Sequence, residues 1–456
     1  MNQRIETVII GAGLTGLAAA YQLESAGYFD YRIFEQECTP GGLCRSVLQD
    51  GFIFDYTGHL LHATAPAAQQ LINQTLGFKN CVSQERQSFI YSNEQVTRYP
   101  FQMNLHALPI SVIADCIEGF VKRRAPNNRT ISNKSSFYSW VQTNFGSGFG
   151  KHFFFPYQEK IFCYPVRRLS ATWTGRFVPA TSLHHIIQGA INPYDNKNVG
   201  YNARFYYPAQ GGIQRLIEGI VTQLINPISY QIKITAINLN NQTIQLSDGS
   251  VIQYKKLIST MPLKALCAMI CDRSDTVFNH AHRQLLASSV LNINVGVSRR
   301  DWTDKHWIYV PEPIYHFYRI GFPHNLTPAM APHEHSSLAL ECAYRDTIPA
   351  DTVAKAIAQA KHLLHIADHE IATVNILDLP CAYVTYNRRR DEVVPVLLAR
   401  LKENGIYSIG RYGSWKYASM QEAIIEGIDT AQELLTITQQ SSVGWRQRPL
   451  HNRIET

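Results

Sequence analysis

Short apolar runs at the start of the chain alternate with a segment of helical character. Residues 8–10 form a Val-Ile-Ile run, residues 17–23 have the composition of an alanine-rich helix, and residues 31–34 form a second run that ends at Glu35. Short apolar runs separated by a helical segment are typical of buried strands in a parallel sheet. The amino terminus therefore predicts a strand–helix–strand unit.

The same alternation returns in two later parts of the chain. Residues 203–265 carry alternating apolar and polar positions with turns between them. Residues 406–409 form another strand-like run, and residues 420–435 have apolar residues at helical spacing. We expect residues 1–62, 203–265 and 400–440 to fold together as one discontinuous domain.

Two insertions separate these pieces. Residues 63–202 are rich in aromatic residues and are predicted to be mostly helical, whereas residues 266–399 mix strands with a helix. The predicted elements of the second insertion are strands at 286–297, 316–320 and 337–344 and a helix at 352–366. We expect the two insertions to form the substrate region. Residues 441–456 are polar, and we predict that they form a poorly ordered tail.

A glycine motif lies between the first strand and the first helix. Residues 11–16 have the spacing G-x-G-x-x-G. Gly11 suits the tight turn, Gly13 lets the backbone approach a pyrophosphate, and Gly16 permits close helix–strand packing. Glu35 follows Gly16 by nineteen residues, where an acid accepts hydrogen bonds from a ribose hydroxyl. A surface glycine turn, the alternative, does not explain all these features in order, so we interpret the motif as a dinucleotide site.

Two segments behind this motif favour FAD over NAD. Gly41 and Gly42, followed by Arg45, suit a larger cofactor that comes close to the protein backbone at a second place. Gly58 and His59 end a predicted hairpin strand that can lie against a flavin ring. A turn with a solvated histidine is the alternative for this last segment.

A third segment at the far end of the chain fits the same cofactor. The loop at 410–413 precedes the helix at 420–435, whose amino terminus would stabilise negative charge on a reduced flavin; a plain closing helix is the alternative. The candidate cofactor-binding residues are Gly11, Gly13, Leu14, Thr15, Gly16, Glu35, Gln36, Gly41, Gly42, Leu43, Arg45, Gly58, His59, Gly410, Arg411, Ser419 and Met420. We predict an α/β fold: a discontinuous Rossmann-type FAD-binding domain with an inserted helical region and an inserted antiparallel-sheet substrate domain.

Composition limits the classes of partner. A chain of 456 residues favours two domains over a single core. The net charge of +7 is spread along the sequence and fits an anionic small substrate. The dense basic run at 388–390 is followed at once by two acids, so we do not expect nucleic acid as a partner. No apolar run approaches the ~18 residues of a membrane span, so no membrane is expected either.

Cysteine usage indicates the compartment. The nine cysteines are odd in number and form no C-x-x-C pair, which is typical of reduced structural thiols and gives no metal-ligand spacing. The first predicted strand is reached within seven residues of Met1, which leaves no room for a signal peptide. We therefore expect a cytoplasmic protein without a metal site. The sequence does not fix its oligomeric state.

The segment with Gly58, His59 and His62 is similar to the glycine–histidine segment over the flavin face in UDP-galactopyranose mutases. These flavoproteins fall within the wider amine oxidase and protoporphyrinogen oxidase fold, and the resemblance covers residues 7–435. Residues 206–212 resemble the family's Pro-Ala-Arg-Gly-Gly loop near the flavin. The resemblance implies FAD as cofactor.

The substrate positions of that family also have counterparts here. Tyr99, Phe101 and Gln102, with Arg86 upstream, resemble the uridine-binding stretch of the longer members. Aromatic faces can stack a base, and an amide can read its edge as donor and acceptor. The alternative is an aromatic-rich core strand with a buried glutamine.

The resemblance extends to the diphosphate. Arg176 and Arg319 lie in segments similar to those that carry the family's two diphosphate arginines, and Arg411 and Tyr417 lie in its carboxy-terminal signature. Two arginines from separate insertions would hold a diphosphate bidentately, whereas solvated surface arginines are the alternative. The resemblance gives as catalytic candidates His59, His62, Arg176 and Arg319, and as substrate-binding candidates Arg86, Tyr99, Phe101, Gln102, Gln158, Phe162, Trp173, Arg176, Tyr309, Arg319 and Tyr417.

Several positions depart from the family pattern. The family's tryptophan beside the sugar is Phe162 here, and the asparagine four residues before it is Gln158. Two tyrosines expected at the diphosphate fall on Leu326 and Val394, Ser419 replaces an acid or amide, and Arg176 lies one residue closer to Trp173 than in the longer members. The pattern suggests a changed sugar or a changed chemistry.

The resemblance implies a UDP-sugar mutase. N5 of reduced FAD would attack the anomeric carbon, and the pyranose and furanose forms of UDP-galactose or a related UDP-sugar would interconvert. NAD(P)H is a candidate external reductant. Two alternatives remain: an FAD-dependent oxidoreductase of the amine oxidase or protoporphyrinogen oxidase type, and a non-catalytic nucleotide-sugar-binding flavoprotein.

Overall fold

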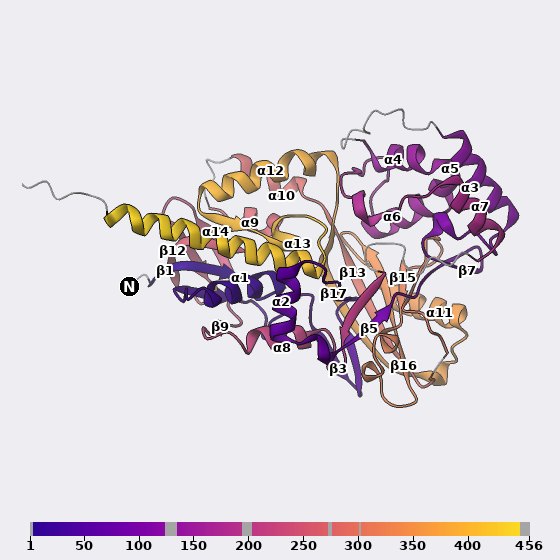
Figure 1. The fold of residues 1–456 in the computed structure, drawn as a ribbon, viewed down its shortest axis with the longest axis horizontal. Coiled ribbons are helices and arrows are strands. Elements are labelled where there is room, and N and C mark those ends of the chain that lie inside the picture. Colours follow the sequence, from indigo (N-terminus) through magenta and orange to yellow (C-terminus); the bar gives the residue numbers. More distant parts are fainter. Residues whose placement is uncertain (1–2, 124–134, 194–202, 272–275, 301, 447–456) are drawn as a thin grey trace, which may run out of the picture.

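Two seven-stranded sheets organise the chain in the computed structural model, which describes residues 3–123, 135–193, 203–271, 276–300 and 302–446 (Figure 1). The first sheet has the order β10 (Ile234–Asn238), β11 (Thr243–Leu246), β12 (Val251–Ser259), β1 (Gln3–Ile10), β2 (Tyr31–Phe34) and β9 (Ile228–Ser229), and β18 (Ile406–Ser408) pairs with β12. β1 pairs in parallel with β12 and with β2, and β12 pairs in parallel with β18. Segments from three distant parts of the chain thus form one parallel core, which confirms the predicted α/β fold.

The second sheet is mainly antiparallel. Its order is β17 (Ile371–Val384), β13 (Ala287–Val297), β16 (Ser336–Tyr344), β15 (Arg319–Gly321), β14 (Trp307–Tyr309), β6 (Ser88–Ser92) and β7 (Gln95–Arg98). β13, which lies between β17 and β16, is buried along most of its length. Its buried Asn292 donates hydrogen bonds to the carbonyl oxygens of Asp55 and Tyr56, which ties this sheet to the amino-terminal part of the chain.

Helices cover both faces of the first sheet. One apolar core joins this sheet to α1 (Leu14–Ser25), α2 (Pro66–Thr75), α8 (Gln214–Val221) and α14 (Met420–Arg446). A second core joins it to α9 (Leu263–Met269), α10 (Thr276–Gln284) and α12 (Arg388–Glu403). α14 runs beside α1 (Figure 1), and a Cβ on Gly427 would lie 2.4 Å from the Thr15 carbonyl oxygen. Only glycine permits this helix–helix contact, which fixes the start of α1 against α14.

A helical region and two small sheets complete the fold. The helices are α3 (Ile110–Lys122), α4 (Phe137–Asn144), α5 (Gly146–Phe149), α6 (Phe155–Phe162) and α7 (Leu183–Ile191), and α11 (Thr352–Leu364) packs on the second sheet. Figure 1 shows α3 to α7 gathered at one end of the molecule. β3 (Ser46–Gln49) pairs with β4 (Phe52–Asp55), and β5 (Cys81–Glu85) pairs with β8 (Arg204–Pro208).

Most predicted elements are present, but the structure also has elements that were not predicted, among them α8, α9, α10, α12 and β14, and other parts differ from the prediction. The insertion at 63–202, predicted to be mostly helical, also contributes the strands β5, β6 and β7. The strand predicted at 316–320 is β15 and begins only at Arg319. The strand β17 was not predicted, since Asn375, Asp378 and Pro380 interrupt its apolar pattern. The tail predicted after residue 440 begins later, because α14 continues to Arg446; residues 447–456 lie outside the described part of the chain.

Candidate active site

A glycine turn joins β1 to α1. Gly11 has φ +97°, and a Cβ on Gly16 would lie 2.1 Å from the Gly11 carbonyl oxygen. Neither position tolerates a side chain, because a positive φ strains other residues and 2.1 Å is far inside van der Waals contact. The turn brings the start of α1, at Leu14 and Thr15, to the edge of the parallel sheet, where the backbone of a helix terminus suits a phosphate.

Glu35 lies beside this turn at the end of β2. Its side chain is buried, Oε2 accepts a hydrogen bond from the Ala12 N–H at 2.7 Å, and Oε1 accepts one from the Glu37 N–H at 3.0 Å. The predicted acid is therefore adjacent to the glycine motif, as a ribose contact requires. Gln36, its predicted neighbour in the cofactor site, is exposed.

The second glycine pair contacts the first motif. The Gly41 N–H donates to the Ala12 carbonyl oxygen at 2.8 Å, and a Cβ on Gly42 would lie 3.5 Å from the Cα of Gly13. Arg45 donates from Nε to the Gly42 carbonyl oxygen at 2.8 Å. The two backbone approaches predicted for a long dinucleotide thus form one continuous lining. Leu43 is partly buried in the same turn.

Asp55 joins the β3–β4 hairpin to the glycine loop after β8. Its Oδ1 accepts hydrogen bonds from Ser46 Oγ at 2.7 Å and from the Ile213 N–H at 3.3 Å, and its Oδ2 accepts one from the Tyr207 hydroxyl at 2.7 Å. Burial raises the pKa of Asp55 to about 6 despite these three donors. A Cβ on Gly212 would lie 2.3 Å from Ser46 Oγ, so the loop and the hairpin need glycine at this contact.

Gly58 and His59 lie against two arginines from distant segments. A Cβ on Gly58 would lie 3.5 Å from Nη2 of Arg319. Burial, together with the positive charges of Arg319 and Arg411, lowers the pKa of His59 to about 4. The imidazole is therefore neutral near pH 7. Its Nδ1 is buried without a hydrogen-bond partner in the described part of the chain, which fits a site that a bound flavin completes.

Arg319 is held by a buried acid on the neighbouring strand. Its Nη2 lies 2.5 Å from Oε1 of Glu341, which is 2% exposed and also accepts a hydrogen bond from the Tyr318 hydroxyl. Burial acts to lower the pKa of Arg319, but the Glu341 carboxylate outweighs it and the pKa lies well above its ordinary value. The arginine is a fixed cation in a site from which water is largely excluded.

Arg411 forms the opposite side of the same cluster. Its guanidinium donates to the carbonyl oxygens of Ala418 at 3.1 Å and Ala382 at 3.0 Å. It lies 4.8 Å from the ring centroid of Tyr417 and 5.4 Å from that of Tyr383. The predicted carboxy-terminal arginine and tyrosine are thus in contact, close to His59.

Aromatic rings form one edge of the cluster. The Arg86 guanidinium lies 5.1 Å from the ring centroid of Tyr99, and the Tyr99 and Tyr309 centroids are 5.3 Å apart. Burial raises the pKa of Tyr309, while the charges of Arg319 and Arg86 both act to lower it. Tyr309 therefore links the predicted base-binding stretch to the predicted diphosphate arginine. Tyr157 of α6 packs edge-on against Tyr309, with centroids 5.4 Å apart.

Two other residues of the predicted base site lie in the core. Phe101 is fully buried and stacks on Phe153 with centroids 5.1 Å apart. Gln102 is 1% exposed, and its Nε2 donates to the Pro179 carbonyl oxygen at 2.7 Å. Phe101 has no open face for a base, and it lies in a short 3-10 helix (Phe101–Met103) and not in the core strand of the alternative. The open aromatic edge belongs to Tyr99.

The predicted sugar side lies next to Tyr383. Phe162 of α6 has its ring centroid 5.8 Å from that of Trp173 and 6.3 Å from that of Tyr383. Trp173 is partly buried, and its Nε1 has no hydrogen-bond partner within the described ranges. Gln158, one turn before Phe162 on α6, is buried.

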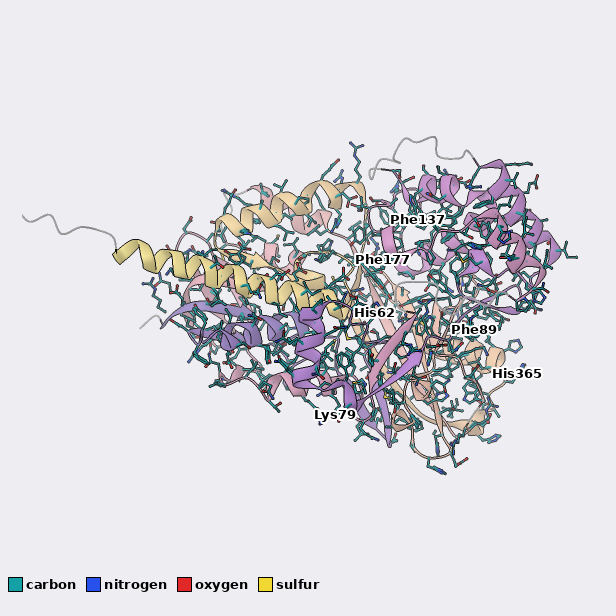
Figure 2. The ribbon with its side chains drawn as sticks, viewed as in Figure 1. His62, Lys79, Phe89, Phe137, Phe177 and His365 are labelled. Atoms are coloured by element: carbon teal, nitrogen blue, oxygen red, sulfur yellow. The ribbon has the colours of Figure 1, made fainter. Side chains whose placement is uncertain are left out.

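Other predicted residues lie apart from this cluster or outside the description. The His62 ring lies 3.2 Å from the Arg204 carbonyl oxygen through Nδ1, in a partly buried position near the start of α14 (Figure 2). The Arg176 side chain lies outside the described part of the chain. Its neighbour Phe177 packs on Tyr417, with centroids 4.7 Å apart, so the segment that carries Arg176 borders the cluster (Figure 2).

Three predicted positions at the carboxy-terminal end are helix-start residues. Residues 410–413, predicted to be a loop, form the short helix α13 (Gly410–Gly413), and a Cβ on Gly410 would lie 2.7 Å from Thr15 Oγ1, so this helix contacts the start of α1. The Ser419 hydroxyl accepts a hydrogen bond from the Glu422 N–H and donates one to the Glu422 carboxylate at 2.9 Å. Ser419 therefore caps the amino terminus of α14. Met420 is partly buried at the first position of that helix.

The substituted tyrosine positions are core residues. Leu326 lies in the apolar core that contains α1 and α14, and Val394 lies in the core that contains α12. Their apolar identity is explained by packing.

Sequence reasoning missed Glu341, Tyr383 and Tyr157. Glu341 pairs with Arg319 across β15 and β16, and it is an acid inside an otherwise apolar strand, which is a signal that the pattern offered. Tyr383 lies in the unpredicted strand β17, where its hydroxyl is 3.3 Å from that of Tyr318. Nothing in the sequence placed it near Arg411.

The described part of the chain contains neither a membrane-spanning helix nor a cluster of metal-ligating side chains. Within the ranges that the structure covers, no helix is long and apolar enough to cross a membrane. Over the same residues, no group of three or more His, Cys, Asp and Glu side chains could hold a metal ion.

The comparisons with known proteins agree with this geometry. The model of the flavin containing amine oxidoreductase family matches residues 14–435. A solved structure of reduced UDP-galactopyranose mutase is similar at a TM-score of 0.87 and 26% identity, over 95% of this chain and 96% of that one. FAD is the cofactor expected from this family.

Two curated plant relatives share shorter segments. A chloroplastic and mitochondrial protoporphyrinogen oxidase 2 of Arabidopsis thaliana is 32% identical over 24% of this chain and 20% of its own length. A mitochondrial protoporphyrinogen oxidase of Nicotiana tabacum is 26% identical over 56% of this chain and 54% of its own length. The chain thus spans about a fifth and about half of these two relatives. It belongs to the flavin containing amine oxidoreductase family, with a fold like that of UDP-galactopyranose mutase.

Proposed function

We propose that this flavoprotein binds FAD and a UDP-sugar and interconverts the pyranose and furanose forms of that sugar, as a UDP-galactopyranose mutase does. The observation that carries the proposal is the convergence of Arg319 and Arg411 on Gly58 and His59, with tyrosines between the two cations. Buried guanidinium groups suit a diphosphate, which they can bind bidentately.

Each of these residues would have a separate role in substrate binding. Arg319 would neutralise the leaving diphosphate and hold it after the bond to the sugar breaks, with Arg176 from the segment beside Tyr417 as the second cation. Tyr99, beside Arg86, would stack the uracil, and Gln158, Phe162 and Trp173 would border the sugar.

The cofactor would lie along the paired glycine turns and under His59. Glu35 would accept a hydrogen bond from the ribose, and the start of α1 would bind the pyrophosphate. Reduced FAD supplies a nucleophilic nitrogen, N5, for the anomeric carbon. The neutral, buried imidazole of His59 would donate or accept one hydrogen bond at the flavin face through its unpartnered Nδ1, and it would not carry a charge into that step.

The oxidoreductase alternative is supported by the protoporphyrinogen oxidase relatives and by the family model. An amine oxidase would receive a cationic or neutral amine, and two buried arginines repel a cation. A porphyrin-type substrate would need an apolar cavity of its size in place of the tyrosine and arginine cluster. We therefore rank the mutase first and the non-catalytic binder, which would show UDP-sugar binding without turnover, third.

The test is an anaerobic incubation of the dithionite-reduced holoprotein with UDP-galactopyranose, with chromatographic detection of the furanose. We expect product only after reduction. Binding of UDP-galactose without any conversion would support the non-catalytic binder, and oxygen-coupled turnover of a protoporphyrinogen or an amine would support the oxidoreductase.

A matched pair of variants tests the role of Arg319. Arg319→Lys keeps the charge opposite Glu341 but loses the two-pronged donor, so we expect UDP affinity to fall about 30-fold or more with FAD content unchanged. Arg388→Ala removes a 92%-exposed arginine that pairs only with Glu392 and serves as the control. Equal UDP affinity in Arg319→Lys and wild type would contradict the assignment.

A further inference from the structure

Lys160 lies on α6 with its ammonium group inside the loop that connects β14 to β15. Nζ donates to the carbonyl oxygens of Val310 at 2.8 Å, Glu312 at 2.9 Å and Phe317 at 2.7 Å. An ammonium group has three N–H donors and no acceptor. Three convergent carbonyl oxygens therefore match its full donor capacity, and no surface ion pair is needed to explain the residue.

The loop that Lys160 holds begins and ends at site residues. Tyr309 is the last residue of β14 and Arg319 the first of β15, and the two are opposite each other in the strand pairing. The Val310 N–H closes the base of the loop on the Tyr318 carbonyl oxygen at 2.8 Å. Any shift of residues 310–318 would move both ends.

A second contact joins the same helix to the same hairpin. Tyr157 lies three residues before Lys160, on the same face of α6, and its ring centroid is 5.4 Å from that of Tyr309 and 6.3 Å from that of Tyr318. α6, which carries Gln158 and Phe162, is therefore fixed at two points to the hairpin that carries Tyr309 and Arg319. One point is the aromatic contact of Tyr157, and the other is the set of hydrogen bonds from the Lys160 ammonium group.

We propose that Lys160 is a positioning residue for the nucleotide-sugar site: its ammonium group sets the β14–β15 hairpin against α6 and so fixes Arg319 and Tyr309 relative to the sugar-side residues. The identity of the ligand rests on the proposed function; the positioning itself rests on the three hydrogen bonds. Lys160 does not touch the substrate in this scheme.

The proposal has a consequence for pH. Burial lowers the pKa of Lys160 to about 7, while Cys342 and Glu312 act to raise it. These two are the titratable groups that face the amine, Cys342 from β16 and Glu312 from the loop; burial raises the pKa of Cys342 to about 12, so this thiol stays neutral near pH 7. A neutral amine has two donors for three carbonyl oxygens, so one hydrogen bond is lost as the pH rises through about 7.

The test is calorimetric titration of the oxidised holoprotein with UDP-galactose between pH 6 and about pH 8.5. This ligand is esterified at both ends of its diphosphate and lacks the phosphomonoester proton that titrates near pH 6. We expect wild-type affinity to fall severalfold across this range. Lys160→Met should bind at least tenfold more weakly at pH 6 and show no such decline.

Lys151→Met is the matched control, since this lysine of the same helical segment is exposed and donates to Asp115 at 2.8 Å. Hydrogen exchange of peptides that cover residues 310–318 should be faster in Lys160→Met than in Lys151→Met. Wild-type affinity in Lys160→Met, or an equal pH profile in both proteins, would overturn the proposal.

If Lys160→Met fails to fold, the pH dependence of UDP-galactose affinity in the wild-type protein still tests the proposal. Affinity that does not change with pH would then overturn it. If wild type binds no UDP-galactose at any pH, the proposed function fails and the ligand assignment with it. If hydrogen exchange of residues 310–318 is the same in Lys160→Met and Lys151→Met, the positioning role of Lys160 fails while the proposed function stands.

Discussion

The buried carboxyl of Asp55 makes the stability of this protein depend on pH, and Asp55→Asn should remove that dependence. Burial raises the pKa of Asp55 from an ordinary value of 3.8 to about 6. The folded protein therefore binds this proton more tightly than the unfolded chain does. The resulting stabilisation is full below about pH 3.8 and is lost as the pH rises through about 6.

The size of the effect follows from the shift. About two pKa units correspond to ~3 kcal/mol over the full range, of which ~2 kcal/mol falls between pH 4.5 and 7.5. With ~2.1 cal/mol/K of unfolding entropy per residue, 456 residues give ~1 kcal/mol per degree. The melting temperature of wild type should therefore fall by about 2 °C more than that of Asp55→Asn over this interval.

The assay is thermal unfolding of wild type and Asp55→Asn at matched ionic strength, followed by near-ultraviolet circular dichroism. Asp304→Asn removes an aspartate that is 80% exposed and serves as the control for the loss of a charge. A parallel decline of the melting temperature in wild type and Asp55→Asn would refute the reasoning. A steeper decline in the variant would show that hydrogen bonds from Tyr207 and Ser46 outweigh burial.

Three further outcomes follow from the site. Gly16→Val should abolish FAD binding, measured as the 450 nm flavin absorbance of the purified protein, because its Cβ would lie 2.1 Å from the Gly11 carbonyl oxygen; a normal flavin content would contradict the turn geometry. Glu341→Gln should free Arg319 from its buried partner and change UDP affinity at least severalfold, and unchanged affinity would show that Glu341 does not set the orientation of the arginine. Turnover should show no inflection near pH 6.5 from His59, whose pKa is about 4; an inflection that disappears in His59→Ala would refute this.

The cofactor-binding part of the fold was predictable because each signal is local. The glycine spacing at 11–16 and the strand at 31–34 depend on neighbours within a few residues, and the structure has the turn, α1 and β2 where they were expected. The position of the second glycine pair, Gly41 and Gly42, in the sequence was enough to predict its contact with the first motif. Backbone sterics fix such features whatever surrounds them.

The substrate part was less predictable because its partners are distant in sequence. Arg319 and Glu341 are 22 residues apart and meet only through the pairing of β15 with β16. Tyr383 lies in a strand whose apolar pattern is interrupted by Asn375, Asp378 and Pro380, and this strand pairs with β13 along most of its length. Pairing of this kind is set by the tertiary fold, so a window of local sequence does not contain it.

Phe101 illustrates a different limit. An aromatic residue beside Tyr99 and Gln102 has the composition of a base-binding stretch and also that of a core strand. The structure separates the two readings by burial: Phe101 is fully enclosed against Phe149 and Phe153, whereas Tyr99 is only partly buried under Arg86. The sequence pattern is the same in both cases, so only packing distinguishes them.

The charge balance of the cluster bears on the class of ligand independently of any particular sugar. Among the described side chains at its centre, Arg319 and Arg411 carry two positive charges and Glu341 one negative charge, all in a buried environment. Burial raises the pKa of the Tyr383 hydroxyl, so it stays protonated and can donate to an anion. An uncompensated buried cation is costly in the free protein, and a bound anion removes that cost. We therefore expect the site to select a negatively charged ligand over an amine, and Phe162, at the position where the family resemblance implies a tryptophan, does not change this charge balance.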